Sequence, residues 1–130
     1  MQRISENENP EYYKKCAVMY ALEIIGGKWR LPIIWELSAE KSMRYNELKR
    51  HLNGITNIML TRSLQGLEKH GLVNRIEYNR IPPHVEYSLT ESCKELLPAL
   101  DIINQWGEDQ MLNPCQGSNY DKDNTEKDSK

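Results

Sequence analysis

The chain has 130 residues, which is typical of a single domain, and its 38% of hydrophobic residues suffices for a modest core. No apolar run approaches the roughly 18 residues that span a membrane, and the polar first residues lack the hydrophobic region of a secretion signal. These features argue against a membrane partner and lead us to expect a cytoplasmic protein.

Charge is distributed unevenly along the chain. The net charge is −2, which alone would argue weakly against a nucleic acid partner. Residues 26–90, however, contain ten Lys and Arg against six Glu, a local net charge of +4. Because the local surface sets the attraction to phosphates, a DNA partner is compatible with this composition.

Three short helices are predicted in the first half of the chain, after a flexible arm at residues 1–11. The first, at residues 12–25, ends at a pair of glycines, which supply the left-handed turn that stops a helix. The second covers residues 28–37 and tolerates a proline in its first turn. A short edge strand at residues 42–44 precedes the third helix, at residues 45–52.

A longer helix followed by a hairpin is the most informative part of the sequence. Thr56 is suited to cap this helix, and Gly71 to end it. Residues 72–78 and 85–89 favour two strands. The intervening "NRIPPH" predicts a turn, because neither proline can donate to a strand ladder. The pattern therefore predicts a mainly α fold with a small β-hairpin, namely a winged helix-turn-helix.

A last helix is predicted from the apolar residues of the C-terminal part. Thr90 and Ser92 both offer caps, and Pro98 should bend this helix or mark its true start. From residue 117 the sequence has no apolar periodicity, so a disordered tail is expected. The predicted domain therefore covers residues 12–116.

The helix that follows Thr56 has two different faces at 100° per residue. Three leucines form a core stripe on one side. The other side carries types suited to base edges in a major groove, since Arg pairs with guanine, Gln with adenine, and Ile or Thr with the thymine methyl group. A solvated polar face is the alternative, but an exposed Ile at the helix start needs a partner. We expect base readout from Ile58, Thr61, Arg62 and Gln65.

Several basic side chains are candidates for contacts with the DNA backbone or for a role in the wing. They lie one turn beyond the readout residues, at the predicted wing tip, and where helices begin. Each of them could instead be an ordinary surface charge. The candidates are Lys69, Arg80, His84, Arg44, Lys28 and Arg30.

The chain resembles the HxlR family of bacterial winged-helix transcription regulators over residues 16–106. The resemblance rests on "GGKW", "RYNELKRHLNGIT", "MLTRSLQGLEKHGLVNR" and "PPHVEYSLT", which begin at residues 26, 44, 59 and 82, and on Trp106. It implies a homodimer held by the first and last helices. Each recognition helix would enter a major groove of a pseudo-palindromic operator, so the implied partners are double-stranded DNA and a second copy of the chain.

The same resemblance singles out Cys16, because family members carry a cysteine just ahead of the first helix and several use it to sense oxidants or electrophiles. The preceding Lys14 and Lys15 and the following helix N-terminus favour its thiolate. The alternative is a small structural residue at the dimer seam. Cys115 is a candidate redox partner. Cys93 stands where the family usually has glycine and is expected to be structural.

Two other functions stay open: a metal-responsive regulator of the same fold and a winged-helix module for protein contacts. Three cysteines and three histidines supply ligand types, but no ligand spacing such as C-x-x-C occurs, so no metal site is predicted. No catalytic pairing and no phosphate-binding glycine loop is present, so we expect neither an enzyme nor a cofactor. The basic central segment disfavours a role in protein contacts alone.

Overall fold

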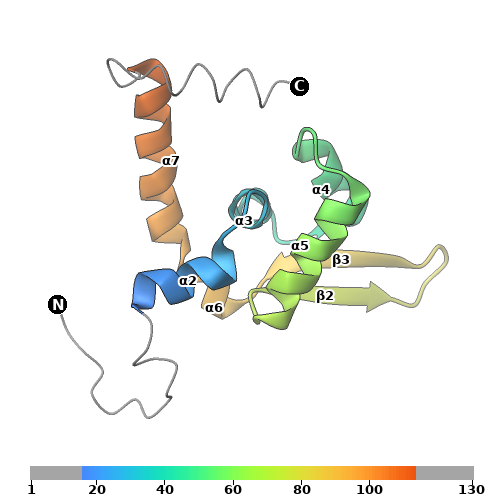
Figure 1. Cartoon of the computed structure of the whole chain (residues 1–130). Coiled ribbons are helices and arrows are strands. Elements are labelled where there is room, and N and C mark those ends of the chain that lie inside the picture. The colour runs from blue at the N-terminus through green and yellow to red at the C-terminus, as the bar shows by residue number, and fades with distance from the viewer. Residues whose placement is uncertain (1–15, 114–130) are drawn as a thin grey trace, which may run out of the picture. The chain divides into compact units, whose positions relative to one another are not determined.

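The computed structural model describes residues 16–113, and the chain forms two compact units divided between Glu95 and Leu96. The predicted arm, the predicted tail and the start of the first predicted helix lie outside the described residues. No helix within the described range is both long and apolar enough to cross a membrane. In chain order (Figure 1) the elements are α2 (Ala17–Ile25), α3 (Arg30–Ser38), β1 (Met43–Arg44), α4 (Tyr45–His51), α5 (Asn57–Lys69), β2 (Val73–Tyr78), β3 (His84–Leu89), α6 (Glu91–Lys94) and α7 (Leu97–Leu112).

The core of the first unit is built by helices packed against a small sheet. The sheet is antiparallel in the order β1-β3-β2, and β2 and β3 form the hairpin. Helices α3, α4 and α5 each turn apolar side chains inward, as the periodicity predicts. The fully buried side chains of these three helices are Ile33, Ile34, Leu37, Leu48, Leu60 and Leu67.

Helix α5 begins and ends where its sequence indicates. The Thr56 hydroxyl accepts a hydrogen bond from the Met59 N–H at 3.1 Å, which satisfies one of the free donors of the first turn. At the other end Gly71 has φ +74°, a left-handed conformation that glycine adopts without strain. This turn lets the Leu72 N–H reach the Leu67 carbonyl at 2.9 Å. Both ends of the predicted recognition helix are therefore fixed by local chemistry.

The hairpin differs from the prediction at His84, which belongs to β3 and not to the turn. Its ring stacks on Tyr78, with 4.8 Å between ring centroids. Its Nε2 lies 2.9 Å from Glu86 Oε2, and the Ser42 hydroxyl donates to Glu86 Oε1 at 2.7 Å. The bonds from Ser42 and His84 lower the pKa of Glu86. The wing tip is thus shorter than the sequence predicted. His84 lies at the start of β3, where its contacts with Tyr78 and Glu86 stabilise the strands that lead into the turn.

The C-terminal helix is divided in two. Thr90 caps the short α6, because its hydroxyl accepts from the Cys93 N–H at 3.1 Å; the cap that Ser92 offers is not used. Pro98 lies in the first turn of α7, where a missing N–H costs little. Of the two expectations for Pro98, the structure therefore confirms that it marks the true start of the helix.

Cys93 is a buried core residue with no exposed surface. Burial raises the pKa of its thiol to about 11. We expect Cys93 to resist iodoacetamide at pH 8 in the native protein and to react once the chain is denatured, whereas the exposed Cys16 should react in both states. Peptide mass spectrometry after labelling measures this. Equal labelling of Cys93 and Cys16 in the native state would contradict the assignment of Cys93 to the buried core.

Candidate nucleic-acid interface

The four side chains expected to read bases all lie on the exposed face of α5. Ile58 is 64% exposed, although it is a large apolar residue. Thr61, Arg62 and Gln65 are also exposed, and Lys69 follows one turn later on the same helix. The intervening Leu60, Leu64 and Leu67 are buried, with at most 2% exposure. The two faces predicted from the sequence are therefore confirmed as one buried and one exposed face. Contact of the exposed face with DNA stays a prediction.

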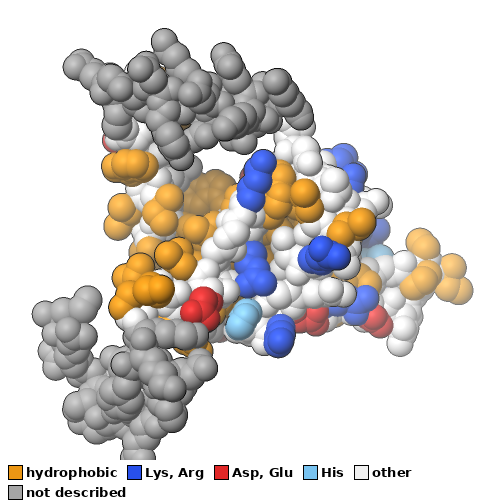
Figure 2. Space-filling model, viewed as in Figure 1, with side chains coloured by type: hydrophobic (Ala, Val, Ile, Leu, Met, Phe, Trp, Pro, Cys, Tyr) orange, Lys and Arg blue, Asp and Glu red, His pale blue; other side chains and the backbone are white. Residues whose placement is uncertain are grey.

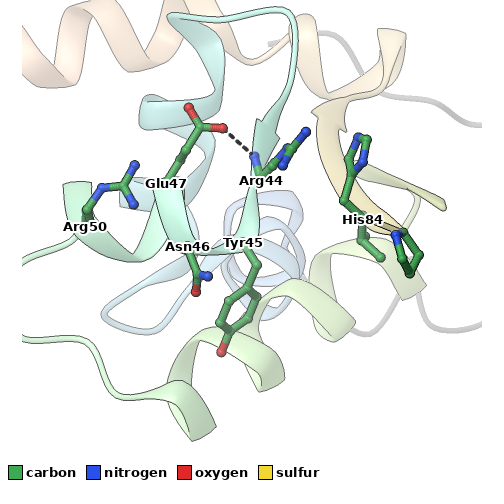
Figure 3. A pocket seen from close by; sticks show the side chains of 8 residues that line it. Arg44, Tyr45, Asn46, Glu47, Arg50 and His84 are labelled. Atoms are coloured by element: carbon green, nitrogen blue, oxygen red, sulfur yellow. Dashed lines mark hydrogen bonds between the residues drawn. The ribbon is translucent and has the colours of Figure 1, made fainter. Parts of the chain in front are cut away.

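A groove of about 620 Å³ lies between the start of α4 and the start of β3 (Figure 3). Arg44 and Arg50 both line it, together with His84. The carboxylate of Glu47, also in the lining, accepts a hydrogen bond from the Arg44 main-chain N–H at 3.0 Å. Two guanidinium groups against one carboxylate leave the groove with a positive balance. Such a groove is suited to a phosphate backbone.

The hairpin extends beyond the helices of the first unit (Figure 1) and carries Arg80 at its exposed turn. The Arg80 guanidinium lies over the Tyr78 ring, 5.0 Å from the centroid. Because Tyr78 in turn stacks on His84, the three side chains form a continuous stack from the strand to the turn. The cation–π contact limits the freedom of Arg80 without neutralising its charge.

The two cations at the start of α3 lie in different surroundings. Lys28 is exposed and has its ammonium group over the Trp29 ring at 5.3 Å. Arg30 is partly buried, and its Nη1 donates to the Ile24 carbonyl at 2.6 Å. A Cβ added to Gly66 would lie 2.2 Å from Arg30 Nη2, so the guanidinium also packs closely against α5. Arg30 therefore links the end of α2 to α5.

Lys and Arg side chains are spread over the part of the surface formed by α4, α5 and the hairpin (Figure 2). This agrees with the local positive charge expected from the sequence.

Tyr45 belongs to the same region, and sequence reasoning missed it. Its hydroxyl lies against the first turns of α5, within 3.1 Å of the Thr61 hydroxyl. No local pattern could have indicated this contact, because it depends on the packing of two helices.

Cys16 occupies the N-cap position of α2 and is exposed. Its Sγ accepts a hydrogen bond from the Met19 N–H at 3.3 Å. The thiol is thus both accessible and oriented toward the positive end of a helix. Cys115 lies outside the described residues. Among the described residues, no three His, Cys, Asp or Glu side chains are close enough together to hold a metal ion.

Comparisons with known proteins agree with this architecture. Residues 24–114 match the family described as HxlR-like helix-turn-helix. The uncharacterized HTH-type transcriptional regulator YdzF of Bacillus subtilis is 44% identical over 94 residues, which cover 72% of this chain and 86% of YdzF. The solved structure of the redox regulator HypR in its oxidized form is 40% identical, with a TM-score of 0.69, and the match covers 72% of this chain and 96% of HypR. The reduced form gives 39% identity and a TM-score of 0.68, with 72% and 92% covered.

Helices α4 and α5 followed by the β2–β3 hairpin define a winged helix-turn-helix, the fold of a class of transcriptional regulators. The chain belongs to the HxlR-like helix-turn-helix family of these regulators.

Proposed function

We propose that this regulator binds a pseudo-palindromic operator as a homodimer and that oxidation of Cys16 controls the binding. The exposed, chemically suited face of α5 beside a basic groove carries the proposal. Ile58, Thr61, Arg62 and Gln65 read bases in the major groove. Around them Lys69, Arg44, Arg80 and Lys28 hold the phosphate backbone, while His84 and Arg30 support the wing and the helix from within.

DNA binding itself is tested by salt dependence. We expect the purified protein to bind a mixed-sequence duplex with a log–log salt slope of about −0.9 for each phosphate contacted. Fluorescence anisotropy of a labelled duplex at several salt concentrations measures the slope. Absence of binding at low salt, or binding that does not respond to salt, would favour the module for protein contacts instead.

Two exposed apolar surfaces support a dimer. In α2 the exposed large side chains are Val18, Met19, Tyr20 and Leu22, and in α7 they are Ile102, Ile103, Trp106, Met111 and Leu112. Figure 2 shows apolar side chains gathered over each of these helices. Contiguous exposed apolar surface marks an interaction site. In a symmetric dimer, a second copy of the chain can cover both apolar surfaces. Such a dimer presents two recognition helices to one operator.

The redox part of the proposal rests on where Cys16 lies. It caps the same helix that exposes an apolar face, so a disulfide at its Sγ would alter the dimer seam. The C-terminal end of α2 is held by Arg30, which also packs on Gly66 of α5. A shift of α2 therefore has a short physical route to the recognition helix. HypR, a relative of known structure, is named a redox regulator and is known in two redox forms.

Replacing Cys16 by Ser tests the redox proposal. Diamide should change the operator affinity of the wild type about 5- to 150-fold, the usual range of allosteric coupling, and should leave Cys16→Ser unchanged. Affinity is measured by anisotropy before and after oxidation and again after reduction. Cys115→Ser is the matched variant that identifies the second thiol. A diamide response that persists in Cys16→Ser would refute the role of Cys16.

A further inference from the structure

Tyr45 connects the two helices of the helix-turn-helix at the surface proposed to face DNA. It is the first residue of α4, and its hydroxyl lies 3.0 Å from the Asn57 carbonyl oxygen and 3.1 Å from Thr61 Oγ1. Its ring points toward α5 and away from the Arg50 side chain (Figure 3). One phenol thus meets the first and second turns of the recognition helix.

The number of available hydrogens decides the direction of these bonds. A tyrosine hydroxyl carries one hydrogen, and a main-chain carbonyl can only accept. Tyr45 therefore donates to Asn57, whose main-chain oxygen lies 3.0 Å and whose side-chain oxygen lies 3.3 Å from the phenol, and the Thr61 hydroxyl donates to the Tyr45 oxygen. With the one phenol hydrogen directed to Asn57, this is the direction that makes the contact with Thr61 a hydrogen bond. The Thr61 hydrogen is then committed to a bond within the chain.

This commitment also fixes the rest of the Thr61 side chain. A threonine in a helix divides between two χ1 rotamers, because its hydroxyl can find different acceptors. The bond to Tyr45 selects one of them, and the methyl group on the same Cβ then has a single direction. A free hydroxyl can bond to several base edges, whereas a threonine methyl favours the methyl group of thymine.

We propose that Tyr45 is a positioning residue that makes Thr61 read a thymine through its methyl group and not through its hydroxyl. The inference rests on the proposed DNA binding and specifies how one position of the half-site is read. Tyr45 itself acts through Thr61 and through the start of α5.

Uracil is the probe that isolates this contact, since it lacks only the thymine methyl group. Each thymine of a duplex selected by the wild type is replaced by uracil in turn. We expect one replacement to weaken wild-type binding about fourfold, the value for one buried methyl-sized group. The other thymines of the half-site serve as internal controls.

Two variants then separate methyl from hydroxyl. Thr61→Val, which is isosteric with threonine, keeps a methyl group and should retain the thymine-over-uracil preference, whereas Thr61→Ser removes the methyl group, keeps the hydroxyl and should lose the preference. Tyr45→Phe, which removes only the hydroxyl, should reduce the preference at that thymine alone. A merely structural role for Tyr45 would lower the melting temperature or the affinity for all duplexes equally.

Three results would overturn the inference while leaving the proposed function intact. They are a wild type that ignores every uracil replacement, a Thr61→Ser variant that keeps the preference, and a Tyr45→Phe variant with an unchanged preference. Failure of the wild type to select any sequence would instead refute the proposed base readout, and this inference with it.

Discussion

Arg62→Ala is expected to cause the largest loss of operator affinity among single substitutions on α5. A bidentate contact between Arg and guanine contributes about 1–3 kcal/mol of discrimination, and in a homodimer the loss occurs at both half-sites. The Arg62 side chain is exposed on the face opposite the core leucines, so truncation should not disturb packing. Anisotropy against the selected operator and against a scrambled duplex measures the effect.

The control for this prediction is Lys94→Ala, which removes a cation from α6 that is paired with Glu91 at 3.1 Å. It should leave the operator affinity unchanged. If Arg62→Ala weakens the operator and the scrambled duplex by the same factor, Arg62 contacts phosphate and does not read a base.

Placing a charge on either apolar helix face is expected to dissociate the proposed dimer. Burying one Leu or Ile side chain stabilises an interface by about 1.5–3 kcal/mol. Because each substitution is present in both subunits of a symmetric dimer, the loss of association free energy doubles. Leu22→Glu in α2 and Ile103→Glu in α7 should therefore raise the dimer dissociation constant by about two to four powers of ten. Sedimentation equilibrium measures this constant directly.

Ile81→Glu is the matched control for dimerisation. Ile81 is 99% exposed in the turn of the hairpin, so a charge there should not change the association state. A wild type that sediments as a monomer would contradict the dimer, as would Leu22→Glu and Ile103→Glu variants that both remain dimeric.

Features set by neighbouring residues were predictable from the sequence. The cap at Thr56, the glycine stop at Gly71 and the leucine stripe between them depend on local chemistry and on helical periodicity. They defined the bounds of α5 to within a residue. Pro98 likewise marks the start of α7, because the proline ring favours the first turn and disfavours the interior of a helix.

Features set by packing across elements were not predictable. The alternation of apolar residues does not show that His84 would belong to β3 and stack on its cross-strand partner Tyr78. The charge of Arg30 suggested a DNA contact, but its guanidinium bonds to the end of α2. The contact between Tyr45 and Thr61 joins residues sixteen positions apart. Each of these three contacts depends on which elements pack against each other in the fold. The residues adjacent in sequence do not specify that packing.

Selection of bound duplexes from a random pool tests the central claim most directly. If α5 reads bases twice from a symmetric pair of subunits, the selected sequences will contain two inverted half-sites. Their centres will lie about 10–10.5 base pairs apart, or a multiple of this distance. Selected sequences with no shared bases, or with a single unrepeated site, would contradict the account.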